Sequence, residues 1–319
     1  MALDFAAIRE AHERIRPHIH RTPVLTSQRL DESAGGRLFF KCENFQKTGA
    51  FKARGATNAV LALSDAVAAR GVATHSSGNH AAALARAARL RGIAAHIVMP
   101  ANSSKVKVRA VEAYGGRIVF CEPTQAARET ACAALVARTG ATLIHPFENE
   151  QVVAGQGTAA VELLEDVPDL DFILCPVGGG GLLAGTAIAA KSLSPRTRVI
   201  AVEPSEAGDA VDSFRAGTLR PRLAALTIAD GLRTNIGGVN FAIMQRWVAD
   251  AVAVSEKAIV SAMRLIWETL KIVIEPSGAV AYAAVAESLI ELRGCRLGIV
   301  ISGGNVDLDA LPWSTARNP

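Results

Sequence analysis

Along the first half of the chain, short apolar runs alternate with longer segments in which apolar residues recur every three or four positions. The short runs predict strands and the longer segments predict helices, because side chains alternate faces along a strand while a helix turns once in 3.6 residues. The predicted strands are residues 72–75, 95–99, 117–121 and 142–145. The predicted helices, each followed by glycine, are residues 59–70, 79–91, 103–114 and 125–139. This alternation predicts right-handed βαβ units and a parallel sheet.

The second half repeats the alternation on a larger scale. Its predicted strands are residues 172–177, 198–202 and 297–301. Its predicted helices are residues 155–164, 182–192, 256–271 and 278–292. No low-complexity linker divides the chain, and its 319 residues can form two lobes with separate cores. We therefore expect one compact α/β protein with a cleft between two lobes.

Composition narrows the function classes. The chain is 50% hydrophobic and 20% charged, and its net charge of +4 comes from scattered Lys and Arg. We expect no nucleic-acid partner, although a small anionic ligand stays possible. No apolar run approaches the ~20 residues of a membrane span, and residues 1–18 indicate an amphipathic helix instead of a signal peptide. Five cysteines without CxxC spacing favour reduced thiols and a cytoplasmic location.

Four consecutive glycines, Gly178–Gly181, join a predicted strand to a predicted helix. Glycine permits positive φ, and backbone N–H groups at a helix start bind anions, so a phosphate is the expected ligand. No Lys-Ser/Thr follows, which excludes a P-loop. A dinucleotide site is an alternative, because Gly179, Gly181 and Ala184 fit GxGxxA and the acidic Glu203 follows at a suitable distance.

Two further segments carry candidate chemistry. Lys52 follows Phe51 at the start of a predicted helix. The helix N-terminus and the neighbouring Lys47 and Arg54 would both favour the neutral form of its amine, if they lie close to it. A neutral amine is what an imine-forming lysine requires. The polar loop of residues 75–80 precedes a helix and can bind a carboxylate, or else simply cap that helix.

Five motifs now occur in the order and spacing of the fold-type II pyridoxal-phosphate enzymes, and they resemble above all the threonine/serine dehydratase and serine racemase family. They are Phe45–Lys52 (FQKTGAFK), Ser76–His80 (SSGNH), Gly155–Gly157 (GQG), Gly178–Gly181 and Ser302–Asn305 (SGGN). The resemblance covers nearly the whole chain. An NAD-binding protein becomes a remote alternative, because it accounts for neither Lys52 nor Ser302.

The resemblance implies an α/β fold of the tryptophan synthase β type, with parallel twisted sheets flanked by helices and the cofactor in the cleft between domains. The large domain would comprise residues 1–50 and 146–319, and the small domain residues 51–145. Pyridoxal 5′-phosphate would be the cofactor and a small amino acid the substrate. A homodimer is also implied.

The same resemblance assigns roles to individual residues. Lys52 would hold the cofactor aldehyde as an imine and, once freed, remove the substrate's α-proton. Phe51 would lie beside the cofactor, Asn79 would bond to its ring 3′-oxygen, and Gly178, Gly179, Gly180 and Gly181 would hold its phosphate. The substrate carboxylate would be bound by Ser76, Ser77, Asn79 and His80. A glutamate at the position of Glu275 approaches the cofactor in this family, although here it could also be part of a helix cap.

Ser302 stands where the family places the partner of the pyridine nitrogen. A hydroxyl cannot fully protonate that nitrogen, so early loss of a β-leaving group is favoured over a long-lived carbanion. We therefore expect an ammonia-lyase that converts threonine, serine or a 3-hydroxy analogue to a 2-oxo acid and ammonia. The alternative is a racemase, in which Ser77 would be a second base on the opposite ring face. Phe147, where serine racemase has Asn, brings the chain closer to the dehydratases.

A divalent-cation site is implied as well. The segment Glu203–Asp209 resembles the cation site of serine racemase, with carboxylates from Glu203 and Asp209 and the carbonyl of Ala207. Oxygen ligands of this kind suit Mg²⁺, Mn²⁺ or Ca²⁺. Without the resemblance, acidic residues after a strand are more often simply solvated.

Overall fold

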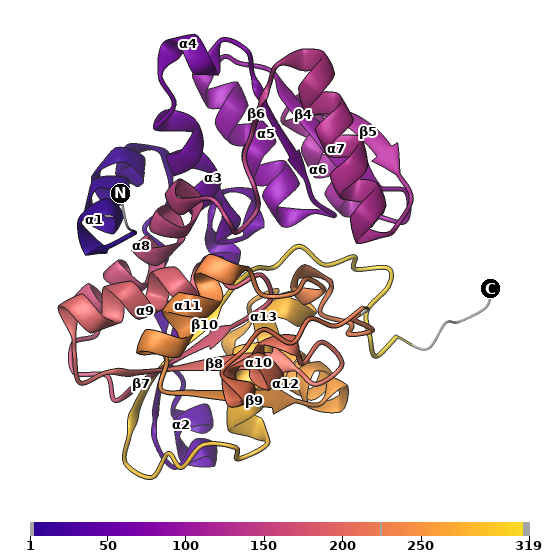
Figure 1. Ribbon diagram of the computed structural model, residues 1–319. Coiled ribbons are helices and arrows are strands. Elements are labelled where there is room, and N and C mark those ends of the chain that lie inside the picture. Colours follow the sequence, from indigo (N-terminus) through magenta and orange to yellow (C-terminus); the bar gives the residue numbers. More distant parts are fainter. Residues whose placement is uncertain (1–2, 224, 315–319) are drawn as a thin grey trace.

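The computed structural model describes residues 3–223 and 225–314, and it has two lobes stacked one above the other (Figure 1). Each lobe is built around its own sheet. The described strands of residues 72–143 form one sheet, and the strands before and after them form the other. The predicted boundaries between the two domains, near residues 50 and 146, stay a prediction.

The upper lobe contains a four-stranded sheet in the order β5-β4-β3-β6, and all its strands are parallel as predicted. Its strands are β3 (Val72–His75), β4 (Ala95–Pro100), β5 (Arg117–Cys121) and β6 (Thr142–Leu143). Its helices are α3 (Lys52–Leu61), α4 (Asp65–Ala68), α5 (Asn79–Arg91), α6 (Lys105–Ala113) and α7 (Gln125–Thr139). Because β4 and β6 lie on opposite sides of β3, a crevice is expected at the carboxyl ends of β3 and β6.

The lower lobe contains a six-stranded sheet in the order β1-β2-β10-β7-β8-β9, parallel except for β1. Its strands are β1 (Val24–Leu25), β2 (Arg37–Cys42), β7 (Phe172–Pro176), β8 (Arg198–Pro204), β9 (Asp250–Val254) and β10 (Arg296–Ile301). The remaining helices are α1 (Phe5–Ile15), α2 (Gln28–Ala34), α8 (Glu150–Asp166), α9 (Gly181–Leu193), α10 (Asp209–Ala216), α11 (Gly238–Trp247), α12 (Glu256–Leu270) and α13 (Pro276–Ala286).

Several predicted boundaries are wrong; the helix expected over residues 155–164, for example, begins at Glu150 as α8. The helix expected over residues 59–70 is broken, because Ser64 is extended and starts the separate helix α4. The helix expected over residues 278–292 ends at Ala286, and Ser288 then takes a left-handed conformation. The strand expected over residues 142–145 is paired for only two residues.

Glycines allow three helices to cross closely beneath the cleft. A Cβ atom at Gly155 of α8 would lie 2.6 Å from the Cα of Gly55 in α3. A Cβ at Gly157 would lie 2.9 Å from the carbonyl oxygen of Gly185 in α9. Real Cβ atoms do not approach so closely, so the motif Gly155–Gly157 is accounted for by helix packing.

A buried cluster of four charged residues joins β2, the following 3-10 turn, α3 and α8. The Arg54 guanidinium donates to the carboxylates of Glu43 and Glu162, at distances between 2.7 and 2.8 Å. Lys41 Nζ donates to Glu162 at 2.7 Å. All four side chains are buried. Two cations and two carboxylates balance one another, and this balance fixes the first turn of α3, where Lys52 lies.

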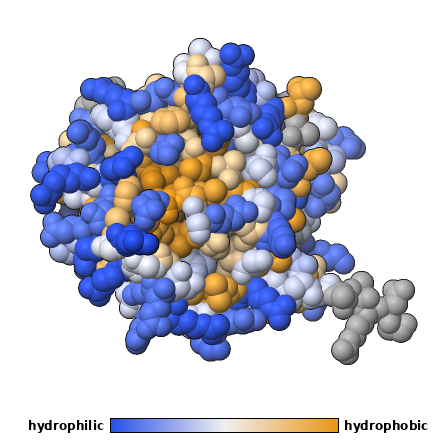
Figure 2. Space-filling model, turned by 90° about the horizontal axis from the view of Figure 1, so that it is seen from below, coloured by the Kyte–Doolittle hydropathy of each residue, from blue (hydrophilic) through white to orange (hydrophobic). Residues whose placement is uncertain are grey.

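The surface adds two observations. No helix among residues 3–223 and 225–314 is both long and apolar enough to cross a membrane. Seen from the side of the lower lobe, apolar residues gather at the centre of the face and hydrophilic residues surround them (Figure 2).

Candidate active site

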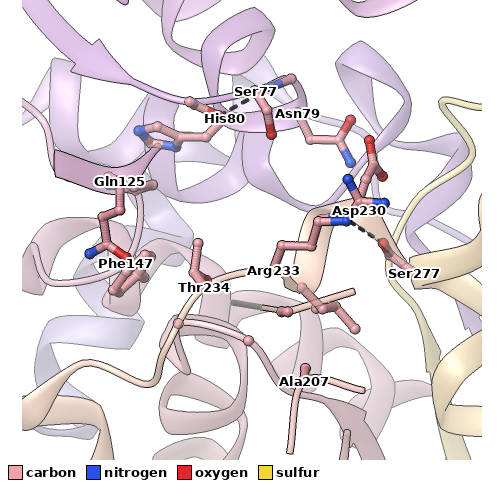
Figure 3. Close-up of a pocket in the computed structure, with 18 of the residues that line it drawn as sticks. Ser77, Asn79, His80, Gln125, Phe147, Ala207, Asp230, Arg233, Thr234 and Ser277 are labelled. Atoms are coloured by element: carbon pink, nitrogen blue, oxygen red, sulfur yellow. Dashed lines mark hydrogen bonds between the residues drawn. The ribbon is translucent and has the colours of Figure 1, made fainter. Parts of the chain in front are cut away.

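A cavity of about 510 Å³ lies between the lobes, at the carboxyl ends of β3, β6, β7 and β10. Its walls include every residue that the sequence proposed for cofactor and substrate: Phe51, Lys52, Ser76, Ser77, Asn79, His80, Gly178, Gly179, Gly180, Gly181 and Ser302. Ser77, Asn79 and His80 lie above the cavity, and Ala207, Thr234 and Ser277 lie below it (Figure 3). The structure thus brings the proposed site residues from four separate segments to one site.

Lys52 is the first residue of α3, and its Nζ donates to the carbonyl of Pro146 at 2.9 Å. Burial lowers the pKa of this amine to about 8. The sequence had predicted a favoured neutral amine, but from nearby positive charge. The actual cause is burial, because the Arg54 charge is balanced by Glu43 and Glu162. At pH 7 to 7.4 most of this amine is still protonated, but roughly a tenth to a fifth is neutral, far more than for an exposed lysine.

The loop before α5 offers backbone N–H groups to the cavity. Gly78 is the N-cap residue of α5, and no side chain caps this helix, so the simple capping alternative for Ser77 and Asn79 is wrong. Asn79 is instead held from two sides. Its Nδ2 donates to Glu275 Oε1 at 2.6 Å, and its Oδ1 accepts from Asn305 Nδ2 at 3.0 Å. The uncapped helix start is suited to an anion such as a carboxylate.

The tetraglycine turn is shaped by its neighbours. Gly180 has a φ of 86°, and Gly181 then begins α9 without a side-chain cap. A Cβ at Gly179 would lie 2.2 Å from Phe147 Cγ, and one at Gly180 would lie 2.8 Å from Asn240 Cβ. Uncapped N–H groups at the start of a 13-residue helix fit a phosphate.

The dinucleotide alternative is wrong. Glu203, its candidate ribose ligand, is fully buried, and its carboxylate accepts from the backbone N–H groups of Ala210 at 3.1 Å and Val211 at 2.9 Å. This carboxylate holds the start of α10 and cannot reach a ribose in the cleft.

Ser302 follows β10 and is buried, and its hydroxyl donates to the carbonyl of Ser277 at 3.2 Å. The site thus combines a buried lysine amine, a turn suited to phosphate and a neutral hydroxyl. The family model "Pyridoxal-phosphate dependent enzyme" matches residues 15–303. The chain belongs to this family. The lysine, the glycine turn and the hydroxyl all fit its cofactor.

Relatives of this pyridoxal-phosphate dependent enzyme are similar over nearly its whole length. A beta-hydroxyaspartate dehydratase of Paracoccus denitrificans is 50% identical over 95% of this chain and 96% of its own. A serine racemase of Arabidopsis thaliana is 48% identical over 99% of this chain and 97% of its own. The solved structure of maize serine racemase matches with a TM-score of 0.94 and 46% identity, covering 97% of this chain and 95% of its own. These matches confirm the predicted fold class.

An unpaired arginine in this enzyme's cavity was missed by the sequence reasoning. Arg128 lines the cavity from the first turn of α7, and none of the ion pairs among the described residues includes it. Its Nε is buried and has no hydrogen-bond partner in the described part of the chain. Burial lowers the pKa of this side chain. A cation near a helix N-terminus opposes the helix dipole, and this was the signal that could have found it.

Lys107 was also missed. It lies on α6, and its Nζ lies 2.6 Å from Asp230 Oδ2 and 3.3 Å from Glu275 Oε2. Its buried neighbour on the same helix face is Val111, four residues later. A lysine at an apolar-face position was the available signal, because a lysine that is buried usually has a charged partner. Glu275, which the sequence only loosely connected to the cofactor, joins Lys107 to Asn79.

The candidate cation ligands lie at one edge of the cavity. Ala207 and Asp209 line it, whereas Glu203 lies behind them. Burial and the neighbouring Asp209 raise the pKa of Glu203 to about 8, and burial raises the pKa of Asp209. No group of three or more acidic, His or Cys side chains suited to a metal exists among the described residues. A cation here would therefore depend on two carboxylates, a carbonyl and water.

Proposed function

We propose that this enzyme is an ammonia-lyase that eliminates water from a β-hydroxy-L-amino acid, giving a 2-oxo acid and ammonia. The supporting observation is the pairing of the Lys52 amine with the neutral Ser302 hydroxyl in one cavity. When bound, the cofactor supplies the electron sink for the α-carbon. Lys52 takes the α-proton, and the loop of residues 76–80 holds the substrate carboxylate. Ser302 leaves the ring nitrogen without a full proton, which favours loss of the β-hydroxyl.

For the side chain of the substrate we propose a carboxylate, as in 3-hydroxyaspartate. Arg128 supports this, because its half-buried side chain lines the same cavity as Lys52, has a buried Nε without a hydrogen-bond partner and lacks a carboxylate partner in the described structure. A partly buried cation without a partner is costly, and an anionic ligand relieves that cost. The name of the Paracoccus relative agrees with this choice. Threonine and serine would bind without this contact.

The experiment is a panel assay of 2-oxo acid release from 3-hydroxyaspartate, threonine and serine. In Arg128→Met, kcat/KM for 3-hydroxyaspartate should fall about 10- to 100-fold, the range for a hydrogen bond to a charged group. The value for threonine should change little. Arg138→Met, an exposed position on the same helix, is the control. An equal loss for all three substrates would contradict the acidic subsite, and no 2-oxo acid from any of them would contradict the lyase.

A racemase is the second candidate. Ser77 lines the cavity, and relatives of this chain are named serine racemase. Racemisation requires a proton donor on each face of the α-carbon, whereas elimination requires only Lys52 and a protonated leaving hydroxyl. Both products should be measured from one L-hydroxy amino acid, for wild type and Ser77→Ala. If the wild type gives mainly the D-enantiomer, racemase would rank above ammonia-lyase. Loss of that D-enantiomer in Ser77→Ala would identify Ser77 as the second proton donor.

We also propose a bound divalent cation, Mg²⁺, Mn²⁺ or Ca²⁺, at Glu203, Asp209 and the Ala207 carbonyl. Two buried carboxylates close together repel each other, and a cation between them would relieve this repulsion. A cation at a hundredfold excess over its dissociation constant would stabilise the fold by about 2.7 kcal/mol. An unchanged melting temperature and rate after EDTA treatment would refute the site.

We propose further that the enzyme is a homodimer. The apolar centre of the face in Figure 2, with its hydrophilic surroundings, has the character of a protein interface. Sedimentation velocity across a dilution series measures this directly. A monomer at micromolar concentration would contradict it.

A further inference from the structure

Lys107 extends from α6 of the upper lobe to two carboxylates of the lower lobe. Asp230 begins a 3-10 turn (Asp230–Leu232) and Glu275 is the N-cap residue of α13. The distances from Lys107 Nζ are 2.6 Å to Asp230 Oδ2 and 3.3 Å to Glu275 Oε2. The Lys107 and Glu275 side chains are 6% and 1% exposed, whereas that of Asp230 is 32% exposed. The contact therefore crosses the cleft, with one partner buried and one at its mouth.

The aliphatic part of Lys107 lies on the substrate loop. A Cβ atom at Gly78 would lie 2.2 Å from Lys107 Cδ and 3.0 Å from its Cγ. Gly78 separates Ser76 and Ser77 from Asn79, and it is the N-cap residue of α5. The loop and the lysine stem thus pack without space for any side chain at this position. One side chain contacts both the loop and the opposite lobe.

The contact continues from Lys107 into the site. Glu275 Oε2, the oxygen nearest Lys107, is buried and receives no hydrogen bond from the described residues. Its other oxygen, Oε1, accepts from Asn79 Nδ2 at 2.6 Å. Asn305 then holds Asn79 Oδ1 at 3.0 Å and donates to the carbonyl of Thr48 at 2.7 Å. The Lys107 charge thus balances the carboxylate that orients Asn79.

The electrostatics favour a charged Lys107. Burial alone would lower its pKa, but the charges of Glu275 and Asp230 outweigh burial and raise it. Without the ammonium, Glu275 would be a buried carboxylate with no cation beside it. Asp230 would then lose its partner across the cleft. The contact between the upper and lower lobes would therefore be weaker beside the loop of residues 76–80, which is proposed to bind the substrate.

We propose that Lys107 is a positioning residue, a clasp that holds the upper lobe closed on the lower lobe and keeps the loop of residues 76–80 in its substrate-binding conformation. Because it acts on the loop that receives the amino-acid carboxylate, the kinetic part of this inference rests on the proposed function. Opening of the clasp admits substrate, and its re-formation brings the loop back over the bound amino acid. The apparent affinity of the enzyme for its substrate is proportional to the fraction of molecules in the closed state, so it falls when that fraction falls.

The test uses Lys107→Met, which keeps a stem to pack on Gly78 and removes the charge. The control is Lys105→Met, an exposed lysine on the same helix. The first measurement is hydrogen exchange of residues 76–82 in the holoenzyme without substrate. Exchange should be at least about tenfold faster in Lys107→Met and in Asp230→Asn than in wild type and the control. Lys107→Arg should restore most of the protection.

The second measurement is steady-state kinetics with serine, which does not engage Arg128. KM should rise about tenfold in Lys107→Met while kcat and cofactor occupancy change less than about threefold. The double variant with Asp230→Asn should be no worse than either single one, because both remove the same contact.

Unchanged exchange in Lys107→Met would overturn the clasp. So would a rise in KM that is accompanied by a matching fall in melting temperature and cofactor occupancy. If exchange is faster in Lys107→Met but the wild type releases no 2-oxo acid from any β-hydroxy amino acid, the lyase proposal fails and the clasp stands, because the exchange comparison is made without substrate.

Discussion

Replacing Lys52 by methionine should stabilise the protein without its cofactor, although it removes the residue on which the proposed chemistry depends. Burial lowers the pKa of this amine from 10.5 to about 8. At about 1.4 kcal/mol per pH unit, charging the amine in the folded state costs about 3 kcal/mol. Methionine fills similar space and carries no charge. It forfeits the hydrogen bond to Pro146, which contributes about 1 kcal/mol. The net gain is about 2 kcal/mol at pH 7.

The sign of the pH dependence follows from proton binding. Because the folded pKa lies below the unfolded value, the unfolded chain binds more protons between pH 8 and 10.5. The stability contribution of Lys52 therefore rises with pH across that window. Below pH 8 the full cost is present, and at pH 10 it has dropped below about 1 kcal/mol. The advantage of Lys52→Met should vanish there.

The assay is thermal unfolding of the cofactor-free proteins at pH 7 and pH 10. For a chain of this length, about 2 kcal/mol corresponds to about 3 °C in melting temperature. Lys257→Met, at an exposed position, controls for the general effect of removing a positive charge. A Lys52→Met protein that melts no higher than wild type at pH 7, or whose advantage is the same at both pH values, would refute the argument from burial.

Two other predictions concern packing and charge. In Gly179→Ala the new methyl would overlap the Phe147 ring, at 2.2 Å from Cγ, so the cofactor dissociation constant should rise at least about tenfold. Adding Phe147→Ala should restore part of the lost cofactor affinity, and a double variant without any recovery would contradict the steric cause. Arg54→Met leaves the carboxylates of Glu43 and Glu162 with only one buried cation. The free energy of unfolding, measured by urea titration, should therefore fall by about 3–5 kcal/mol. A change below about 1 kcal/mol would show that charge does not hold the cluster together.

Much of the fold was legible because its elements carry local signals. The helices at Asn79–Arg91 and Gln125–Thr139 were predicted with their exact bounds, since a left-handed glycine ends each one. The strand β2 was not predicted, although five of its six residues are buried. Its charged Lys41 breaks the apolar run, and the charge is neutralised by Glu162, which lies 121 residues later. Only the tertiary structure shows that partner.

The site divides in the same way. Lys52, the serine loop and the glycine turn stand in contiguous motifs, so sequence alone could name them. Arg128 and Lys107 each lie inside an ordinary helix. Arg128 is unusual because it has no ion-pair partner among residues 3–223 and 225–314, and Lys107 because its partners lie across the cleft. Pairing across long sequence separations has no local signature. A charge at a position that disfavours it was the one available hint.

The two classes of residue also differ in what they decide. The motif residues form the part of the cavity that fits the cofactor, and relatives named for different reactions are all similar over these segments. The choice among reactions and substrates must then come from residues around that common part. In the proposals above, Arg128 binds the side-chain carboxylate of the substrate, and Lys107 positions the loop that binds its α-carboxylate. A substrate with an anionic side chain would contact both the loop and the Arg128 guanidinium, because closure of the clasp would place both against the same bound molecule. Specificity in this enzyme would then depend on the closed state of the cleft, which is why the Arg128 and Lys107 variants should be compared with the same panel of substrates.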